Sequence, residues 1–369
     1  MREFQEILAK ISQFAPDEKA ILATVVDVVG SGYRRPGARM LIDENGYSIG
    51  TVSGGCLEAD VLERAKKVLE TGESAVITYD TTQDENSVFG LSMGCRGIVR
   101  ILLEAVAKES LIFNAFDCVV KNREKSIVAT LINGENNLSI GGRVFYDRLG
   151  QFDFNYLPNS FENLESLKGD CLKVYDGEAK YKIETYETEQ GAAEFFIERI
   201  EPPLSLLLFG AGFDALPLIR FAKELGWRVT TIDHRAAYNN AERIPESDEI
   251  IVSNSEDLSE SLFADENSVG VIMTHNYERD RNILRRLINS KCLYVGALGP
   301  KKRTENLLEE IGETFSVEQL GRLYAPVGLD IGADTPEEIA LAIIAEIRAV
   351  LSGRKSGFLR ERRGSIYGG

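Results

Sequence analysis

The chain contains the run Leu204-Ser205-Leu206-Leu207-Leu208-Phe209, which leads directly into Gly210-Ala211-Gly212. A continuous apolar run of this length predicts a strand buried on both faces, and the glycines predict a tight turn between that strand and a helix. Alternating strands and helices are typical of a parallel, doubly wound sheet. We therefore predict an α/β fold with a Rossmann-like sheet in the C-terminal half. Further buried strands are expected at 228–232, 249–252, 269–274 and 293–296.

The first 200 residues carry a different pattern, in which short strands are separated by glycine-rich loops. The dipeptide Asn45-Gly46 lies between two β-type runs and is a strong signal for a hairpin turn. A helix is expected to open at Ser53-Gly54-Gly55-Cys56 and to reach about Leu69, because apolar residues recur along one side. Strands are expected at 20–29, 39–42, 47–52, 74–79 and 97–103, with weaker β-like runs at 127–132, 144–146, 172–175 and 193–197.

The consecutive prolines Pro202-Pro203 mark the expected hinge between the two halves, because proline continues neither a helix nor a strand ladder. We predict an N-terminal mixed α+β domain at 1–200, in which 110–198 forms extra antiparallel structure. A Rossmann-like domain follows at 201–352, and a basic tail at 353–369.

Composition limits the classes of function. The 369 residues include 42 basic and 58 acidic side chains, a net charge of −16, which argues against binding to nucleic acid or to an anionic membrane surface. No apolar run is long enough to cross a membrane. Five cysteines without disulfide spacing predict a reducing, cytoplasmic location. With only two histidines, a metal centre built from several histidines is not expected.

Five residues form a predicted nucleotide site in the C-terminal half. Gly210 permits the tight turn, and Gly212 leaves room for a pyrophosphate at the helix N-terminus. Asp233, at the end of the next strand, would hold a ribose hydroxyl, and Arg235 would instead accept a 2′-phosphate. His275 follows another strand at the same edge and would serve as a ligand or an acid–base group. The ligand would be NAD(P) or another nucleotide, although such sheets also occur without one.

Two cysteines lie in glycine-rich loops of the N-terminal half. Cys56 follows Gly54 and Gly55 at a predicted helix N-terminus, where the helix dipole lowers the pKa of a thiol. Cys95 follows Gly94 in a long polar loop, and a loop of this length is more often functional than idle. Soft thiolates are ligands for transition metals. The plainer interpretation is that both cysteines are small residues packed under loops.

Arginines accompany these loops. Arg96 directly follows the second cysteine and also favours its thiolate form. Arg34 and Arg35 lie in the loop 30–37 and would hold an anionic group through their guanidinium groups. Exposed arginines in a turn are an equally simple explanation.

Several motifs occur in a fixed order along the chain. They include Gly50-Thr51-Val52-Ser53-Gly54-Gly55-Cys56-Leu57-Glu58 and Ala325-Pro326-Val327-Gly328-Leu329-Asp330-Ile331-Gly332-Ala333, with further matches at 30–31, 35–40, 94–97, 209–212, 226–229, 233–235, 273–276, 294–299 and 335–340. Together they resemble the XdhC/CoxI family, accessory proteins of molybdenum hydroxylases such as xanthine dehydrogenase and carbon monoxide dehydrogenase. The resemblance covers both ends of the chain and leaves about 110–198 unmatched.

The sequence departs from the family pattern at two positions. Phe213 stands where the family usually has histidine after Gly-Ala-Gly, which weakens any role that needs an imidazole at this turn. Arg96 replaces the first glycine of the usual Cys-Gly-Gly, which puts a cation and steric bulk beside Cys95.

The resemblance implies a maturation chaperone rather than a catalyst, with no catalytic residues of its own. It would bind the molybdenum cofactor (molybdopterin with molybdenum), shield it while a cysteine desulfurase supports its sulfuration, and insert it into an apo molybdenum hydroxylase. Cys56 and Cys95 would be molybdenum ligands, and Arg34 and Arg35 would hold the phosphate. A homodimer is expected.

Two other functions are compatible with parts of the sequence. An NAD(P)-dependent oxidoreductase would use His275 as its proton donor, but it leaves the N-terminal cysteine loops without a role. A thiol-based sulfur carrier would use Cys56 or Cys95 as a persulfide and would need no nucleotide. A complete xanthine dehydrogenase is excluded, because the iron–sulfur cysteine patterns are absent.

Overall fold

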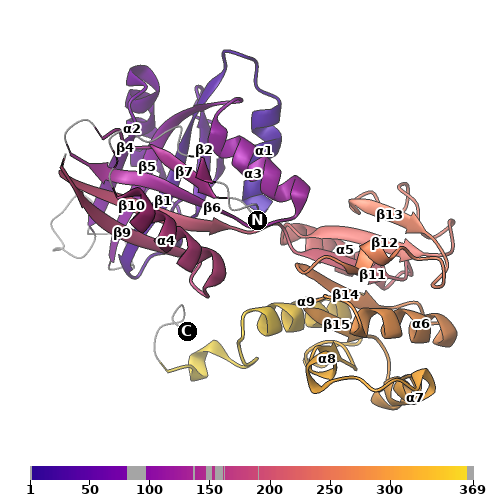
Figure 1. Ribbon diagram of the computed structural model, residues 1–369. Helices are drawn as coiled ribbons and strands as arrows, with labels where there is room; N and C mark the ends of the chain where they lie inside the picture. Colours follow the sequence, from indigo (N-terminus) through magenta and orange to yellow (C-terminus); the bar gives the residue numbers. More distant parts are fainter. Residues whose placement is uncertain are drawn as a thin grey trace. The chain divides into compact units, whose positions relative to one another are not determined.

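The computed structural model describes residues 2–80, 97–135, 138–146, 152–153, 161, 163–189 and 191–363 (Figure 1). Internal contacts divide the chain into two units, of which the first is Glu3–Pro202 and the second begins at Pro203. Within the described ranges, no helix is long and apolar enough to span a membrane.

The N-terminal unit begins with an antiparallel sheet in the order β3-β2-β1-β5-β4. The predicted hairpin at Asn45-Gly46 is confirmed, because β2 and β3 pair antiparallel with Ile42 opposite Ser48. Helix α2 (Glu58–Thr71) covers one face of this sheet through Val61 and Ala65. The strands are β1 (Lys19–Gly30), β2 (Arg39–Asp43), β3 (Ser48–Gly50), β4 (Ala75–Asp80) and β5 (Gly97–Ala107).

A second antiparallel sheet completes this unit, in the order β8-β7-β6-β10-β9. The predicted β-like run at 172–175 is wrong, because it lies in helix α4 (Leu164–Asp176). Leu167, Cys171 and Val174 recur at helical spacing and are all buried, so their stripe packs on the sheet as one helix face. The strands are β6 (Ser126–Gly134), β7 (Arg143–Tyr146), β8 (Phe152–Asp153), β9 (Tyr181–Thr188) and β10 (Gly191–Ile200).

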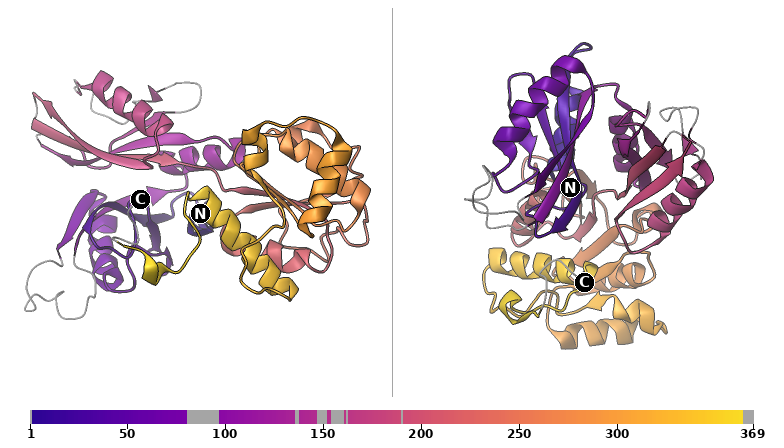
Figure 2. Two further views of the ribbon diagram at one scale, coloured as in Figure 1. Left: turned by 90° about the horizontal axis from the view of Figure 1, so that it is seen from below. Right: turned by 90° about the vertical axis from the view of Figure 1, so that its left-hand side faces the viewer.

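The two antiparallel sheets pack against each other as two layers, which Figure 2 shows on its right side. Val26 and Leu102 of the first sheet meet Phe196 of the second in a shared apolar cluster. A buried ion pair between Arg39 of β2 and Glu198 of β10 also joins them, and both side chains are below one-tenth exposed. Helices α1 (Arg2–Ser12) and α3 (Leu111–Asn122) close one side of the same core.

The second unit holds a six-stranded parallel sheet in the order β13-β12-β11-β14-β15-β16. The predicted Rossmann-like fold is confirmed, and so is the mixed α+β character of the N-terminal unit. Strand order reverses between β11 and β14, the point at which such sheets bind ligands beyond their carboxyl ends. The strands are β11 (Ser205–Phe209), β12 (Arg228–Asp233), β13 (Glu249–Val252), β14 (Ser268–Ile272), β15 (Tyr294–Ala297) and β16 (Leu323–Tyr324).

Helices cover both faces of this sheet (Figure 1). On one face α5 (Ala215–Glu224) and α9 (Pro336–Leu351) pack together over a core that includes Trp227, which is 4% exposed. On the other face lie α6 (Tyr277–Ile288), α7 (Lys301–Ile311) and the 3₁₀ turn η1 (Glu260–Phe263). The remaining elements are α8 (Val317–Gly321) and η2 (Leu359–Glu361).

Candidate functional site

Ser53 organises the glycine-rich turn that precedes α2. Its Oγ accepts hydrogen bonds from the backbone amides of Gly55, Cys56 and Leu57 at 3.2, 3.1 and 3.1 Å. The same hydroxyl donates to the carboxylate of Glu58, which also accepts from the Ser53 amide at 2.8 Å. Burial alone would raise the pKa of Glu58, but the hydrogen bonds from Ser53 outweigh it and hold the pKa below its usual value. The turn is therefore fixed by its own side chains.

The turn leaves the side chain of Cys56 exposed. Gly54 lies directly against the ring of Tyr33, since a Cβ at Gly54 would stand 3.2 Å from that ring. Gly55 has φ +102°, a conformation that favours glycine. Tyr33 belongs to the loop 30–37, so the structure brings this loop and the cysteine turn together. An exposed thiol and an exposed aromatic ring, 64% accessible, are presented on the same surface.

The two arginines predicted to hold an anion lie in this loop. Arg34 forms an ion pair with Glu3 of α1, and its side chain is 27% exposed. Arg35 also has an interaction partner. An anion would therefore reach Arg34 only by replacing a carboxylate, and no sequence pattern predicted that carboxylate at this position.

The second predicted cysteine loop lies outside the described residues, including Gly94, Cys95 and Arg96. Gly97, where β5 begins, approaches Ser31 so closely that a Cβ would stand 2.6 Å from the Ser31 carbonyl oxygen. Within the described residues, no group of three or more His, Cys, Asp or Glu side chains is placed to hold a metal ion. The proposed molybdenum ligands thus stay a prediction.

The predicted nucleotide residues of the second unit lie at the carboxyl edge of its sheet. Gly210 has φ +116°, and a Cβ there would stand 2.3 Å from the carbonyl oxygen of Met273. The turn after β11 and the loop after β14 are thus in direct backbone contact. Asp233 ends β12, and His275 lies in the loop after β14.

The carboxylate of Asp233 is 2% exposed and fully engaged. It accepts from the Ala211 amide at 2.8 Å, from the Arg235 amide at 2.9 Å and from the Arg235 guanidinium at 2.7 and 3.0 Å. Burial opposes ionisation, yet these hydrogen bonds, with Arg235 first, lower the pKa of Asp233 to about 2. Asp233 therefore fixes the glycine turn in addition to facing the predicted ribose position.

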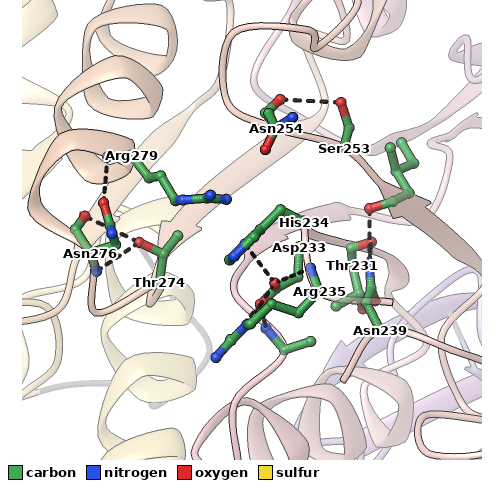
Figure 3. Close-up of polar contacts among 12 residues, drawn as sticks. Thr231, Asp233, His234, Arg235, Asn239, Ser253, Asn254, Thr274, Asn276 and Arg279 are labelled. Atoms are coloured by element: carbon green, nitrogen blue, oxygen red, sulfur yellow. Dashed lines mark hydrogen bonds and ion pairs between the residues drawn. The ribbon is translucent and has the colours of Figure 1, made fainter. Parts of the chain in front are cut away.

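His234 and Arg279 face one small cavity beside Asp233 (Figure 3). The cavity measures about 20 Å³, room for one water molecule, and also reaches Ser253 and Thr274. Burial and the nearby charge of Arg279 lower the pKa of His234, so its imidazole is neutral at pH 7. Its Nδ1 lies 3.1 Å from Asp233 Oδ1. The guanidinium of Arg279 forms no ion pair with any described residue.

His275 has a bonding partner that was not predicted from the sequence. Its Nε2 lies 2.7 Å from Oδ2 of Asp214, at the start of α5, while the imidazole stays 63% exposed. His275 also has φ +57°, rare for a residue with a side chain. The two residues are 61 positions apart, and only the contact between the two loops brings them together.

Three further residues of these sites, Ser53, Glu58 and Arg279, were also not predicted as functional. A serine five residues before a glutamate at a predicted helix start was a usable signal for the first two, because both side chains accept backbone amides. No sequence signal points to Arg279, which reaches the edge only because α6 begins there.

Comparison with known proteins identifies the class of each part. Residues 206–347 match the model described as the XdhC Rossmann domain, and residues 14–80 match the model of the XdhC and CoxI family. The chain belongs to the XdhC and CoxI family.

Relatives support this assignment over nearly the whole length. The chain is 32% identical to a Bacillus subtilis protein described as a probable component of xanthine dehydrogenase, over 89% of this chain and 92% of that protein. It is 23% identical to the "Molybdenum cofactor insertion chaperone PaoD" of Escherichia coli, over 90% and 83%. A crystal structure described as a xanthine dehydrogenase from Bacillus halodurans is 28% identical, with a TM-score of 0.78 over 96% of this chain and 97% of that one.

Proposed function

We propose that this protein binds the molybdenum cofactor, protects it during sulfuration by a cysteine desulfurase, and inserts it into an apo molybdenum hydroxylase of the xanthine dehydrogenase type. The observation that carries the proposal is the exposed thiol of Cys56 on a turn fixed by Ser53 and Glu58. The relative named as a molybdenum cofactor insertion chaperone supports it. In this role the protein is a maturation chaperone in the cytoplasm, acts as a homodimer, and is not a catalyst.

The chemistry of the cargo fits the residues around Cys56. The cofactor is a flat, phosphorylated pterin dithiolene that holds molybdenum, and a thiolate is a soft ligand for such a metal. The exposed ring of Tyr33 beside Gly54 offers a surface on which the pterin would stack. Arg34 would hold the phosphate by exchanging it for the carboxylate of Glu3, since a guanidinium binds both groups through the same donors. Arg35 would assist.

Cys95, with Gly94 beside it, remains the proposed second thiolate of this site. The nucleotide site of the Rossmann unit, formed by Gly210, Gly212, Asp233, Arg235 and His275, would bind NAD(P), another nucleotide or the nucleotide part of an extended cofactor. Because Asp233 is already bonded to Arg235, a ribose hydroxyl would add to these bonds rather than replace them.

Pterin content tests the chaperone proposal. The protein is purified anaerobically from a host that makes the cofactor, and released, oxidised pterin is measured by fluorescence in wild type, Cys56→Ala and Cys118→Ala. Cys118 is a matched control, because it is also exposed and lies in the same unit. We expect near-stoichiometric pterin in wild type and Cys118→Ala and a loss in Cys56→Ala. Pterin retained in Cys56→Ala would remove the thiolate from the proposal, and no pterin in wild type would remove the function.

A second pair of variants tests the aromatic contact. Tyr33 and Tyr47 are both 64% exposed in the same unit, but only Tyr33 lies against the cysteine turn. We expect Tyr33→Ala to lower pterin content and Tyr47→Ala to retain it. Equal content in the two variants would contradict stacking on Tyr33.

The exposed thiol also favours one alternative, a sulfur carrier that holds a persulfide on Cys56. Cyanide-labile sulfur on the purified protein, absent from Cys56→Ala and without bound pterin, would favour that alternative over the chaperone.

A further inference from the structure

The glycine turn of the Rossmann unit is covered by a carboxylate of its own. In a dinucleotide-binding turn the second glycine leaves its face open, so that the pyrophosphate reaches the backbone. Here a Cβ at Gly212 would stand 2.7 Å from Oδ1 of Asp214. Asp214 precedes α5 in the capping position but accepts no amide of that helix. Its side chain is folded over the glycine instead.

His275 holds this carboxylate in place. Its Nε2 lies 2.7 Å from Oδ2 of Asp214, and the contact between Gly210 and Met273 keeps the two loops close. Asn276, next to His275, caps α6 by accepting the Arg279 amide at 3.0 Å, so the histidine stands on an anchored backbone. The carboxylate of Asp214 is therefore fixed from both sides of the turn.

The surrounding charges do not neutralise an added anion. Arg235 is the cation whose charge interacts with Asp214, but its guanidinium is already paired with Asp233 at 2.7 Å. A diphosphate at the start of α5 would meet the carboxylates of both Asp214 and Asp233. Two like charges a few ångströms apart repel each other strongly where water is partly excluded.

We propose that Asp214 is a specificity-determining residue that disfavours diphosphate-bridged nucleotides at the Rossmann turn. Such a ligand enters only when Asp214 leaves the face of Gly212 and breaks its bond to His275. A nucleoside without phosphate does not meet this carboxylate. This inference rests on the proposed nucleotide site.

Calorimetric titration of the full chain tests the proposal with ADP, NADH and adenosine. For Asp214→Asn we expect ADP and NADH to bind roughly tenfold tighter than to wild type, the order expected for removing one partly screened charge. Adenosine affinity should change less than twofold. His275→Gln is the matched variant, because it breaks the same contact but keeps the carboxylate, and it should bind ADP no tighter than wild type.

Each outcome has a distinct meaning. Equal ADP affinity in wild type and Asp214→Asn, or the same gain for adenosine as for ADP, would overturn the role of Asp214. No binding of any ligand to any variant would overturn the nucleotide site together with this inference, and pterin content measured separately would still test the chaperone. Trp227 fluorescence on heating verifies that Asp214→Asn is folded, and Asp214→Ser repeats the test with a smaller side chain.

Discussion

The two glycine-rich turns of this chain both precede a helix, yet they use their backbone amides differently. At residues 53–56 the amides of Gly55 and Cys56 point at the Ser53 hydroxyl, and the exposed group is a thiol. At residues 210–214 the Ala211 amide points at Asp233, and a carboxylate covers the glycine. A glycine-rich turn is thus not by itself an open anion site, because the side chains around it decide which group a ligand meets.

The comparison predicts that the Rossmann turn depends most strongly on one carboxylate. Replacing Asp233 by alanine leaves the Arg235 guanidinium and the Ala211 amide without their acceptor, and we expect a loss of about 3 kcal/mol in the free energy of unfolding. Trp227 is the single tryptophan of the chain, so its fluorescence in urea reports on this unit alone. The exposed Glu242 provides the control, and Glu242→Ala should match wild type. Equal midpoints for the two variants would contradict the prediction.

The same carboxylate gives this turn a defined acid dependence. The pKa of Asp233 is lowered from 3.8 to about 2 in the folded chain, so its stabilisation is complete above the unfolded value and is lost as pH falls toward 2. The advantage of wild type over Asp233→Asn should therefore shrink by about 2 kcal/mol across this range, with roughly half lost by pH 3. Urea midpoints measured between pH 6 and pH 3 test this. A difference that does not change with pH would mean that Asp233 is not held ionised by these contacts.

The cysteine turn should depend on Ser53 to a smaller extent. Ser53→Ala removes the acceptor of three amides, but the turn is partly open to water, and we expect a loss of roughly 1 kcal/mol. Hydrogen exchange at the amides of residues 55–57 should become faster. Ser48→Ala, at an exposed serine of the same unit, should leave exchange at these amides unchanged. Protection retained in Ser53→Ala would show that another group holds the turn.

Cys56 should contribute least to stability. Its side chain is exposed, so Cys56→Ala should change the free energy of unfolding by less than about 0.5 kcal/mol. Calorimetry of the same preparations used for pterin measurement separates the two effects. A large loss of stability would mean that Cys56 is a structural residue, and any loss of pterin would then have a trivial cause.

The sequence predicted the Rossmann unit well because its strands are continuous apolar runs, which few other structures accommodate. The hairpin at Asn45-Gly46 was equally accessible, since its signal lies within two residues. Helix α4 was missed at 172–175, because a short apolar run has no clear period until its neighbours Leu167 and Cys171 are counted with it.

Contacts between distant residues were not predictable. The ion pair of Arg34 with Glu3 and the pair of His275 with Asp214 depend on how loops meet after folding. The residue types were visible in the sequence, but their partners were not. For this reason the predicted edge of the sheet is confirmed, whereas the binding roles of Cys56, Cys95 and His275 stay predictions.

The ion pairs between the two antiparallel sheets have a consequence for how the N-terminal unit can be divided. Arg39 pairs with Glu198, Arg143 with Glu104, and Arg100 with Glu194 at 2.6 Å, each joining one sheet to the other. Cutting the chain near residue 110 would leave buried charges without partners on both fragments. The matched segment at 14–80 is therefore not an autonomous folding module, and we expect residues 3–202 to unfold in a single cooperative transition.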